Sequence, residues 1–369
     1  MRVAFLTSSR ADFGIYLPLL VEMKKDPFFD LRLIVFGTHL SAFHGYTMTD
    51  IDSAEFTTDY RIENTMASDT PEAIATSMAV TGMKFASVWQ REQLNYELVF
   101  CLGDRYEMFA AVSAGVPFNI KFAHIHGGET TLGSIDNQFR HCISIFSKLH
   151  FTSTEQYAKR VSEITGDQGN IHVVGALSLD NLSRIALLDA GEFQTKYHVD
   201  LRKPTLLVTY HPETVKADRN SANAEQLVAA LNAFNNYQII ITMPNADTTA
   251  NGMRSIYTDF ASKNHNVRII ENFGTLGYFS CMALSKIVVG NSSSGIIEAA
   301  SLRKYVVNIG NRQKGRAVSD NIVHAVSDSQ SIIMACREAI SRGDYEGRNI
   351  YHKPNASRAI IDILKVWKP

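Results

Sequence analysis

Short apolar runs rich in β-branched residues alternate with helical segments through the first half of the chain. These runs are VAFLT (3–7), LRLIVFG (31–37), ELVFCLG (97–103), NIKFAHI (119–125), HFTS (150–153) and IHVVG (171–175). Strands that alternate with helices in this way are typical of βαβ units around a parallel sheet. The clearest helix is predicted at 71–93, because Thr70 can cap it and Pro71 suits its first turn.

The same alternation starts afresh near residue 204. The apolar runs there are TLLVTY (205–210), YQIIIT (237–242), VRIIE (267–271), KIVVG (286–290) and YVVNI (305–309). At 369 residues the chain also exceeds the usual domain length of ~100–200 residues. We therefore predict an α/β protein with two Rossmann-like, doubly wound domains that face a cleft.

The predicted N-terminal domain spans 1–176 and the predicted C-terminal domain spans 177–352. A helical segment at 178–189 lies near their junction. The last segment, 353–369, contains a helix with no strand after it, and we expect this helix to pack back on the first domain.

Charge and cysteine usage narrow the class of protein. The formal net charge is −1, with 36 Lys+Arg against 37 Asp+Glu and no long run of either sign, which argues against a nucleic-acid or polybasic membrane surface. The four cysteines are widely spaced and sit among apolar or helical neighbours, as reduced thiols do. The opening MRVAFLTSSR is too short in apolar residues for a signal sequence or a spanning helix. We expect a cytoplasmic protein.

Polar motifs follow most of the predicted strands, where open parallel sheets bind their ligands. They are SSRADFG (8–14), GDRYE (103–107), HIHGGETTLGSID (124–136), HPET (211–214), GNSSSG (290–295) and NIGNRQKGR (308–316). No GxGxxG fingerprint follows any predicted strand, and the chain has no GxxxxGK[ST] loop. NAD chemistry and ATP hydrolysis are therefore disfavoured.

GNSSSG stands between an apolar strand and a helical IIEAASL segment, so its backbone N–H groups suit an anion. The alternative is a plain serine N-cap. Arg10 lies beyond the first strand, and Arg312, Lys314 and Arg316 lie beyond YVVNI. These cations can reach a diphosphate.

Three carboxylates also lie at strand ends. Asp104 follows LVFCLG directly, a position that also suits a helix cap, whereas Glu129 and Asp136 flank the glycines of the HIHGGETTLGSID motif. His124, His126 and Glu129 form HxHxxE, in which both histidines are expected on one face of a strand. This set suits zinc or iron, but a sugar pocket or a structural His124 explains it as well.

In this order and at these spacings, the motifs resemble the hydrolysing UDP-N-acetylglucosamine 2-epimerases of bacterial sialic-acid synthesis. The resemblance also includes Arg140-His141 and NADT (245–248), and it extends from residue 1 to about 316. It implies a GT-B-like fold, a UDP-sugar between the domains, no metal and no cofactor, and a homodimer or homotetramer. Matching motif residues are the predicted substrate-binding residues: Arg10, Arg105, Arg140, His211, Asn245, Asn291, Ser292, Ser293, Ser294, Gly295, Glu298 and Arg316.

The implied reaction converts UDP-N-acetylglucosamine and water to N-acetylmannosamine and UDP, feeding sialic-acid-type sugar synthesis. The C2 hydrogen is not alpha to a carbonyl, so UDP must leave first or concertedly, to give a 2-acetamidoglycal that water then attacks. Asp104 is the predicted base at C2, and Glu129 and Asp136 are predicted to handle water. Many relatives carry glutamate where this chain has His126, so the acid role falls on Glu129 or, as the second choice, on His126.

Other functions are compatible with parts of this pattern. The same reaction on a UDP-diacetamido-trideoxyhexose, of the legionaminic-acid type, uses similar motifs. A GT-B glycosyltransferase and a non-hydrolysing epimerase also bind nucleotide sugars, but the first needs an acceptor and the second retains the nucleotide. A catalytically silent nucleotide-sugar sensor would not need the three acids, and a metal-dependent isomerase would be sensitive to a chelator.

Overall fold

The chain folds into two compact units, each with its own parallel sheet. Unit 1 comprises Met1–Glu129, Asp136–Asn181 and the C-terminal segment from Tyr351, and unit 2 comprises Thr130–Ile135 and Leu182–Ile350. The computed structural model describes residues 1–42, 45–66, 68, 70–132, 135–213, 217–244 and 251–368.

Unit 1 is built on a seven-stranded parallel sheet in the order β3-β2-β1-β4-β5-β6-β7. Val3 at the centre pairs with Leu31 on one side and Leu98 on the other. Central strands covered on both faces read as continuous apolar runs, which explains VAFLT and ELVFCLG. The strands are β1 (Arg2–Thr7), β2 (Asp30–Phe36), β3 (Thr58–Ile62), β4 (Leu98–Leu102), β5 (Phe122–Ile125), β6 (Leu149–Thr152) and β7 (Ile171–Val173).

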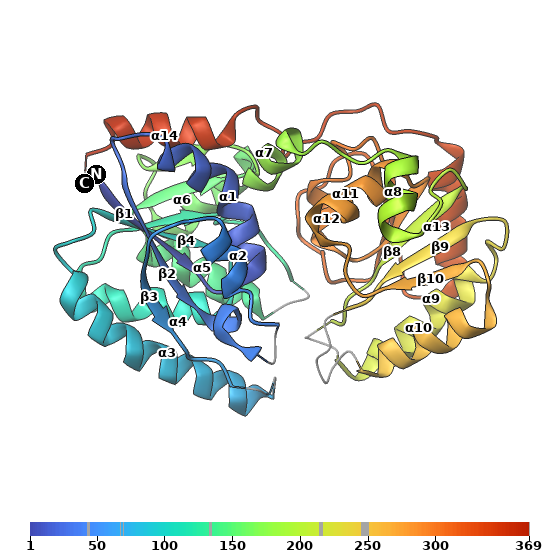
Figure 1. The fold of residues 1–369 in the computed structure, drawn as a ribbon, viewed down its shortest axis with the longest axis horizontal. Helices are drawn as coiled ribbons and strands as arrows, with labels where there is room; N and C mark the ends of the chain where they lie inside the picture. Colours follow the sequence, from blue (N-terminus) through green and yellow to red (C-terminus); the bar gives the residue numbers. More distant parts are fainter. Residues whose placement is uncertain are drawn as a thin grey trace. The chain divides into compact units, whose positions relative to one another are not determined.

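Helices cover both faces of the unit 1 sheet (Figure 1). Side chains alternate along β1, so Val3 and Phe5 pack with α1 and α14 whereas Ala4 and Leu6 pack with α3 and α4. The C-terminal helix α14 lies beside α1 and belongs to unit 1 (Figure 1). The helices are α1 (Arg10–Lys24), α2 (Met48–Ser53), α3 (Pro71–Glu92), α4 (Tyr106–Gly115), α5 (Asp136–Phe146), α6 (Glu155–Thr165) and α14 (Ala356–Val366), with 3₁₀ turns at Gly37–Leu40 and Val116–Phe118. Helix α7 (Leu177–Arg184) begins in unit 1 and ends in unit 2.

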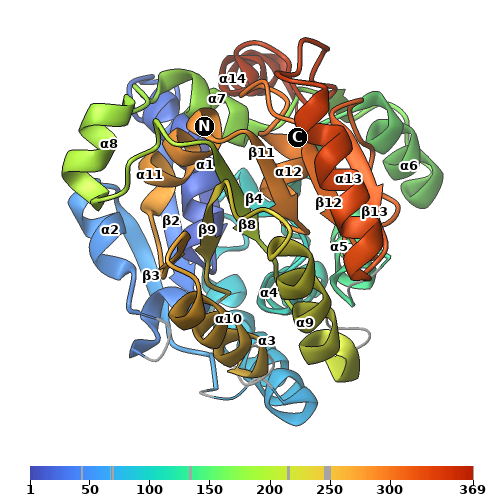
Figure 2. The same cartoon turned by 90° about the vertical axis from the view of Figure 1, so that its right-hand side faces the viewer.

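Unit 2 repeats the plan with a six-stranded parallel sheet in the order β10-β9-β8-β11-β12-β13. Helix α9 packs beside α10 and α13 over one face of this sheet (Figure 2). The strands are β8 (Thr205–Thr209), β9 (Gln238–Thr242), β10 (Val267–Ile270), β11 (Ile287–Gly290), β12 (Val306–Ile309) and β13 (Ile322–Ala325). The helices are α8 (Ala190–Tyr197), α9 (Asn220–Leu231), α10 (Asn251–Lys263), α11 (Gly274–Leu284), α12 (Ser293–Ile297) and α13 (Ser329–Ser341), with a 3₁₀ turn at Ala217–Arg219.

The predicted fold class, an α/β protein with two doubly wound parallel sheets, is confirmed. The prediction for α3 also holds in detail, because the Thr70 side chain accepts a hydrogen bond from the Ala73 N–H and Pro71 is the first helical residue. The helix predicted at 178–189 is shorter than expected, since α7 ends at Arg184. No helix among the described residues is long and apolar enough to cross a membrane. The four cysteines are free thiols.

Candidate active site

One group of predicted site residues lies where β4 and β5 of unit 1 end. Gly103 follows β4 with φ +70°, and Asp104 comes next. The Asp104 carboxylate forms an ion pair and hydrogen bond with Nη2 of Arg140 on α5. Arg140 is 3% exposed, and its Nη1 donates to the main-chain oxygen of Glu129 at 2.9 Å. One buried guanidinium therefore joins the loop after β4 to the loop after β5.

The third predicted acid, Asp136, lies on the same helix as this guanidinium. Asp136 is the first residue of α5, and Arg140 follows it four residues later. Residues at this spacing lie on one face of a helix. The side chain of Asp136 is half-buried. Arg140 thus contacts Asp104 and the main chain of Glu129, and it lies one helical turn from Asp136.

His126 and Glu129 form a buried hydrogen-bonded pair beyond the end of β5. Nδ1 of His126 lies 2.7 Å from Oε1 of Glu129, and the Ser153 hydroxyl donates to the same oxygen at 3.2 Å. When Glu129 is ionised its carboxylate only accepts hydrogen bonds, and Nδ1 of His126 is then the donor. Nε2 of His126 is buried and has no hydrogen-bond partner within the described part of the chain.

The prediction that His124 and His126 lie on one face of a strand is wrong. β5 ends at Ile125, and His126 follows with φ +63°, a left-handed conformation that is uncommon for a residue other than glycine. His124 stays in the strand, where Nε2 donates to the Gly103 oxygen at 2.9 Å and Nδ1 accepts from the Ser144 hydroxyl at 3.0 Å. Burial lowers the pKa of His124 to about 3, so the ring is neutral at pH 7. Its role is structural.

The hydrogen bonds of His124 and His126 also concern the alternative that these histidines and Glu129 bind zinc or iron. His124 uses both ring nitrogens, and His126 uses Nδ1, within unit 1. Over the residues that the structure describes, no group of three or more His, Cys, Asp or Glu side chains is arranged to hold a metal ion.

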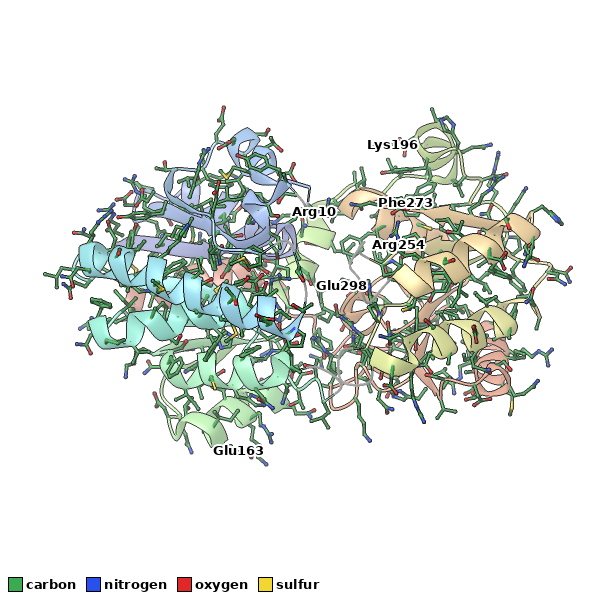
Figure 3. All side chains as sticks on the ribbon, turned by 90° about the horizontal axis from the view of Figure 1, so that it is seen from below. Arg10, Glu163, Lys196, Arg254, Phe273 and Glu298 are labelled. Atoms are coloured by element: carbon green, nitrogen blue, oxygen red, sulfur yellow. The ribbon has the colours of Figure 1, made fainter. Side chains whose placement is uncertain are left out.

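Arg105 lies close to two buried carboxylates at the ends of β1 and β4. Its Nη2 donates to Oε1 of Glu107 at 2.7 Å, and Glu107 is fully buried. Asp12 accepts hydrogen bonds from the main-chain N and the hydroxyl of Ser8 at 3.0 and 2.6 Å. Burial raises the pKa of Asp12, although the positive charge of Arg105 and the bonds from Ser8 oppose the shift. Arg10 begins α1 and is exposed (Figure 3).

In unit 2, the chain turns sharply where β11 ends. Gly290 has φ +139°, and a Cβ atom there would lie 2.0 Å from the main-chain oxygen of Thr209 on the neighbouring strand β8. No other residue fits at this position without moving the strand. Glycine therefore lets the GNSSSG loop pass directly over the end of the sheet.

The serines of this loop form a chain of hydroxyl groups. Ser292 is the N-cap of α12 and accepts a hydrogen bond from the Ser294 N–H at 3.4 Å. The Ser294 hydroxyl lies 2.9 Å from the Ser292 hydroxyl and 2.8 Å from that of Tyr278 on α11. The helical segment predicted here is wrong in length, because α12 ends at Ile297. With so short a helix the dipole is small, so an anion would meet mainly the hydroxyl and N–H groups of the loop.

Asn291, which precedes Ser292 in the GNSSSG loop, holds the main chain of His211. The Asn291 side chain accepts a hydrogen bond from the main-chain N of His211 at 2.7 Å and donates one to its main-chain oxygen at 2.9 Å. Burial, together with the positive charge of Arg312, lowers the pKa of His211 to about 3. His211 is therefore a neutral imidazole at pH 7, able to donate one hydrogen bond and accept another.

The remaining predicted residues of unit 2 lie around α12 or outside the described residues. Ser293 is half-buried in the first turn of α12, Gly295 is buried against β12, and Glu298 is the buried C-cap residue (Figure 3). Arg316 follows the turn after β12. Asn245 lies outside the described residues.

Some buried polar residues of these loops were not predicted. Asp12 stands in the predicted strand-end motif SSRADFG and Glu213 in HPET, whereas Ser153 is the last residue of the predicted strand HFTS, so the position at a strand end was a signal for all three. Tyr278 lies in the middle of α11, and nothing in its local sequence points to the GNSSSG loop.

Two parallel sheets with helices on both faces and polar loops at the strand ends define an α/β protein of the GT-B-like class. A solved structure has this fold: the UDP-N-acetylglucosamine 2-epimerase of Neisseria meningitidis bound to UDP-N-acetylglucosamine aligns over 99% of this chain and 100% of that chain, with a TM-score of 0.81 and 18% identity.

The sequence profile of the UDP-N-acetylglucosamine 2-epimerase family matches residues 21–365. The hydrolysing UDP-N,N'-diacetylbacillosamine 2-epimerase of Legionella pneumophila is 32% identical over 99% of this chain and 95% of its own. The hydrolysing GDP/UDP-N,N'-diacetylbacillosamine 2-epimerase of Campylobacter jejuni is 32% identical over 87% of this chain and 83% of its own. The chain belongs to the UDP-N-acetylglucosamine 2-epimerase family and is an enzyme of that family.

Proposed function

We propose that this protein is a hydrolysing 2-epimerase that converts a UDP-linked 2-acetamido sugar and water to UDP and the free 2-epimeric sugar. The observation that carries the proposal is the buried His126–Glu129 pair next to the Arg140–Asp104 ion pair, which gives unit 1 two different groups for moving protons. The hydrolysing relatives support the reaction type.

Asp104 is the proposed base at C2 of the sugar. Loss of UDP puts positive charge on C1, which acidifies the C2 hydrogen enough for a carboxylate to remove it. The Asp104 side chain is 23% exposed, whereas its partner Arg140 is buried, so a substrate can reach the carboxylate while the guanidinium stays fixed behind it. The product of this step is a 2-acetamidoglycal.

His126 is the proposed acid and base of the hydration step. Because Glu129 holds the proton on Nδ1, Nε2 of His126 is free to accept a proton from water or, once protonated, to donate it to C2. In this arrangement Glu129 acts through His126, and the Ser153 hydroxyl fixes Glu129. Asp136 is proposed to orient the attacking water.

The loops of unit 2 are proposed to bind the departing UDP. Neutral His211 and the hydroxyl and N–H groups of the GNSSSG loop donate hydrogen bonds, which stabilise the diphosphate as it leaves. Glu298 suits the hydroxyl groups of a ribose. The proposed cations for the diphosphate are Arg10, Arg105 and Arg316.

Two substrates of this class are candidates. UDP-N-acetylglucosamine gives N-acetylmannosamine, the precursor expected for sialic-acid-type sugars. UDP-N,N'-diacetylbacillosamine carries the same 2-acetamido group and is the second candidate, because both relatives at 32% identity are named for it. The free thiols fit a reducing compartment such as the cytoplasm. We expect a homodimer or homotetramer, which light scattering after size exclusion measures.

Proton NMR of the turnover in D₂O tests the proposal with each UDP-sugar in turn. We expect free UDP, a free 2-epimeric sugar and deuterium at C2, with turnover unchanged by EDTA. Asp104→Asn should lower turnover by about 10²–10⁴-fold, as the loss of one proton-transfer group does. A UDP-linked 2-epimer would instead identify a non-hydrolysing epimerase, and turnover only with an added acceptor would identify a glycosyltransferase. The sugar with the higher kcat/KM is the substrate.

A further inference from the structure

Both polar atoms of the Asn291 side chain form hydrogen bonds within the protein. It is 1% exposed, and its amide makes two hydrogen bonds to one residue, since Oδ1 accepts from the main-chain N of His211 at 2.7 Å and Nδ2 donates to its main-chain oxygen at 2.9 Å. The amide is therefore aimed at the protein backbone and not at a ligand. Its partner lies at the end of the neighbouring strand β8.

The main chain of Asn291 holds a third loop. Its carbonyl oxygen accepts hydrogen bonds from Nη1 of Arg312 at 3.1 Å and from Nε2 of Gln313 at 2.8 Å. Both donors lie beyond β12, the strand on the other side of β11. One buried residue thus ties together the loops that follow β8, β11 and β12.

A second hydrogen bond joins the loop after β8 directly to the loop after β12. Oε1 of buried Glu213, in the loop after β8, accepts from the main-chain N of Asn311 at 3.0 Å. Gly310 has φ +76°, and a Cβ atom there would lie 2.8 Å from that carboxylate oxygen. The three loops are therefore locked as one body by side chains that are themselves buried.

We propose that Asn291 is a positioning residue that sets the place of the His211 imidazole and joins three loops into one nucleotide cradle, rather than a residue that contacts the nucleotide. The effect on nucleotide binding rests on the proposed function, whereas the effect on His211 does not. Correct placement of a donor matters here because a hydrogen bond weakens steeply with misalignment.

The substitution Asn291→Asp tests the proposal with almost no change in size. A carboxylate can still accept from the His211 N–H, but it cannot donate to the His211 oxygen. The loop should loosen and let water reach the imidazole. The pKa of His211, which burial and Arg312 hold at about 3, should then rise toward the ordinary histidine value. In Asn291→Asp the new carboxylate also raises this pKa, so the uncharged variant Asn291→Ser decides whether positioning is the cause. Two-dimensional ¹H–¹⁵N NMR of the histidine rings of the full chain measures it, with His211→Gln to assign the signal.

Asn321→Asp is the matched control. Asn321 is also fully buried in unit 2 and donates through Nδ2 to the Lys304 oxygen at 2.9 Å, but it precedes β13 and so lies at the other end of the sheet. We expect the His211 signal to change in Asn291→Asp and not in Asn321→Asp. We also expect UDP affinity, measured by calorimetry, to fall about tenfold to a hundredfold in the uncharged variant Asn291→Ser and not in Asn321→Asp, as loss of a buried hydrogen-bond partner does. Asn291→Ser removes the same hydrogen bonds without adding a charge, so both variants are measured.

An unchanged His211 signal in Asn291→Asp and Asn291→Ser overturns the proposal, as does an equal change in the control. Since the NMR comparison uses no ligand, it tests the positioning role of Asn291 whether or not the protein binds UDP. Failure of the unsubstituted protein to bind UDP contradicts the proposed function alone.

Discussion

Arg140 should contribute to the stability of unit 1 mainly through its pairing with Asp104. Replacing it by methionine, Arg140→Met, keeps most of the buried apolar stem and removes the guanidinium. Two acceptors then lose their donors: the Asp104 carboxylate and the main-chain oxygen of Glu129. The first can turn to water, because its side chain is 23% exposed. The oxygen of the buried Glu129 loses its bond to Arg140.

The expected cost follows from these two losses. A hydrogen bond to a charged group is worth about 1.5–3 kcal/mol, and the bond lost by the main-chain oxygen of Glu129 is worth about 0.5–1.5 kcal/mol. Against this, removing the guanidinium also removes the cost of burying it. We therefore expect Arg140→Met to lower the free energy of unfolding by about 2–3 kcal/mol. Combined with Asp104→Asn, the coupling energy between the two positions should be about 1–2 kcal/mol.

Tryptophan fluorescence during urea unfolding measures this in unit 1 alone. The chain has two tryptophans, and both Trp89 and Trp367 pack in unit 1. The four proteins of the double-mutant cycle are unfolded in parallel, and the free energies are compared. If the effects of the two substitutions add to within about 0.5 kcal/mol, the ion pair contributes nothing measurable to the stability of unit 1, contrary to this prediction.

Three further predictions concern single positions. Burial holds the pKa of His124 at about 3 in the folded protein, whereas the unfolded chain binds a proton at this residue below pH ~6.5. Between these two values, the free energy of unfolding should therefore fall by about 1.4 kcal/mol for each unit by which the pH drops. His124→Asn should remove that slope in the fluorescence assay; an unchanged slope contradicts it. Gly290→Ala places a Cβ atom against the Thr209 oxygen and should lower the free energy of unfolding by about 2–4 kcal/mol, which calorimetry detects as a lower transition temperature. An unchanged transition temperature would mean that β8 moves to make room for the side chain. Thr70→Ala removes the bond to the Ala73 N–H and should cost about 1 kcal/mol, whereas Thr70→Ser should not.

The fold was predictable because the interior strands are covered on both faces and must be apolar throughout. The missed strands β3 and β13 are the outer strands of their sheets. An edge strand is covered less, so β3 reads TDYRI with only Ile62 buried, and β13 is a short IVHA with His324 exposed. Such segments carry no continuous apolar run, and their place in the sheet is fixed by the neighbouring strand rather than by their own composition.

The position of the candidate site could be predicted from the sequence, whereas the contacts and conformation of each residue were harder to predict. Strand ends identified the loops that carry Asp104, Glu129, His211 and the serines. Pairing between side chains was out of reach, because partners such as Arg140 and Asp104 are 36 residues apart in sequence. The backbone of His126 was mispredicted, since nothing in HIHGGE marks where the strand stops and a left-handed residue begins.

Each unit holds its share of the proposed site through its own contacts. In unit 1 the acids depend on Arg140, Ser153 and the main chain of unit 1, and in unit 2 the loops depend on Asn291 and Glu213. The exception is the segment Thr130–Ile135, which belongs to unit 2, where the Leu132 N–H donates to the Lys314 oxygen at 3.0 Å. The main chain thus leaves unit 1 directly after Glu129 and re-enters it at Asp136, two of the predicted acids. The loop after β12 is therefore tied by one hydrogen bond to the segment that follows Glu129 in the chain.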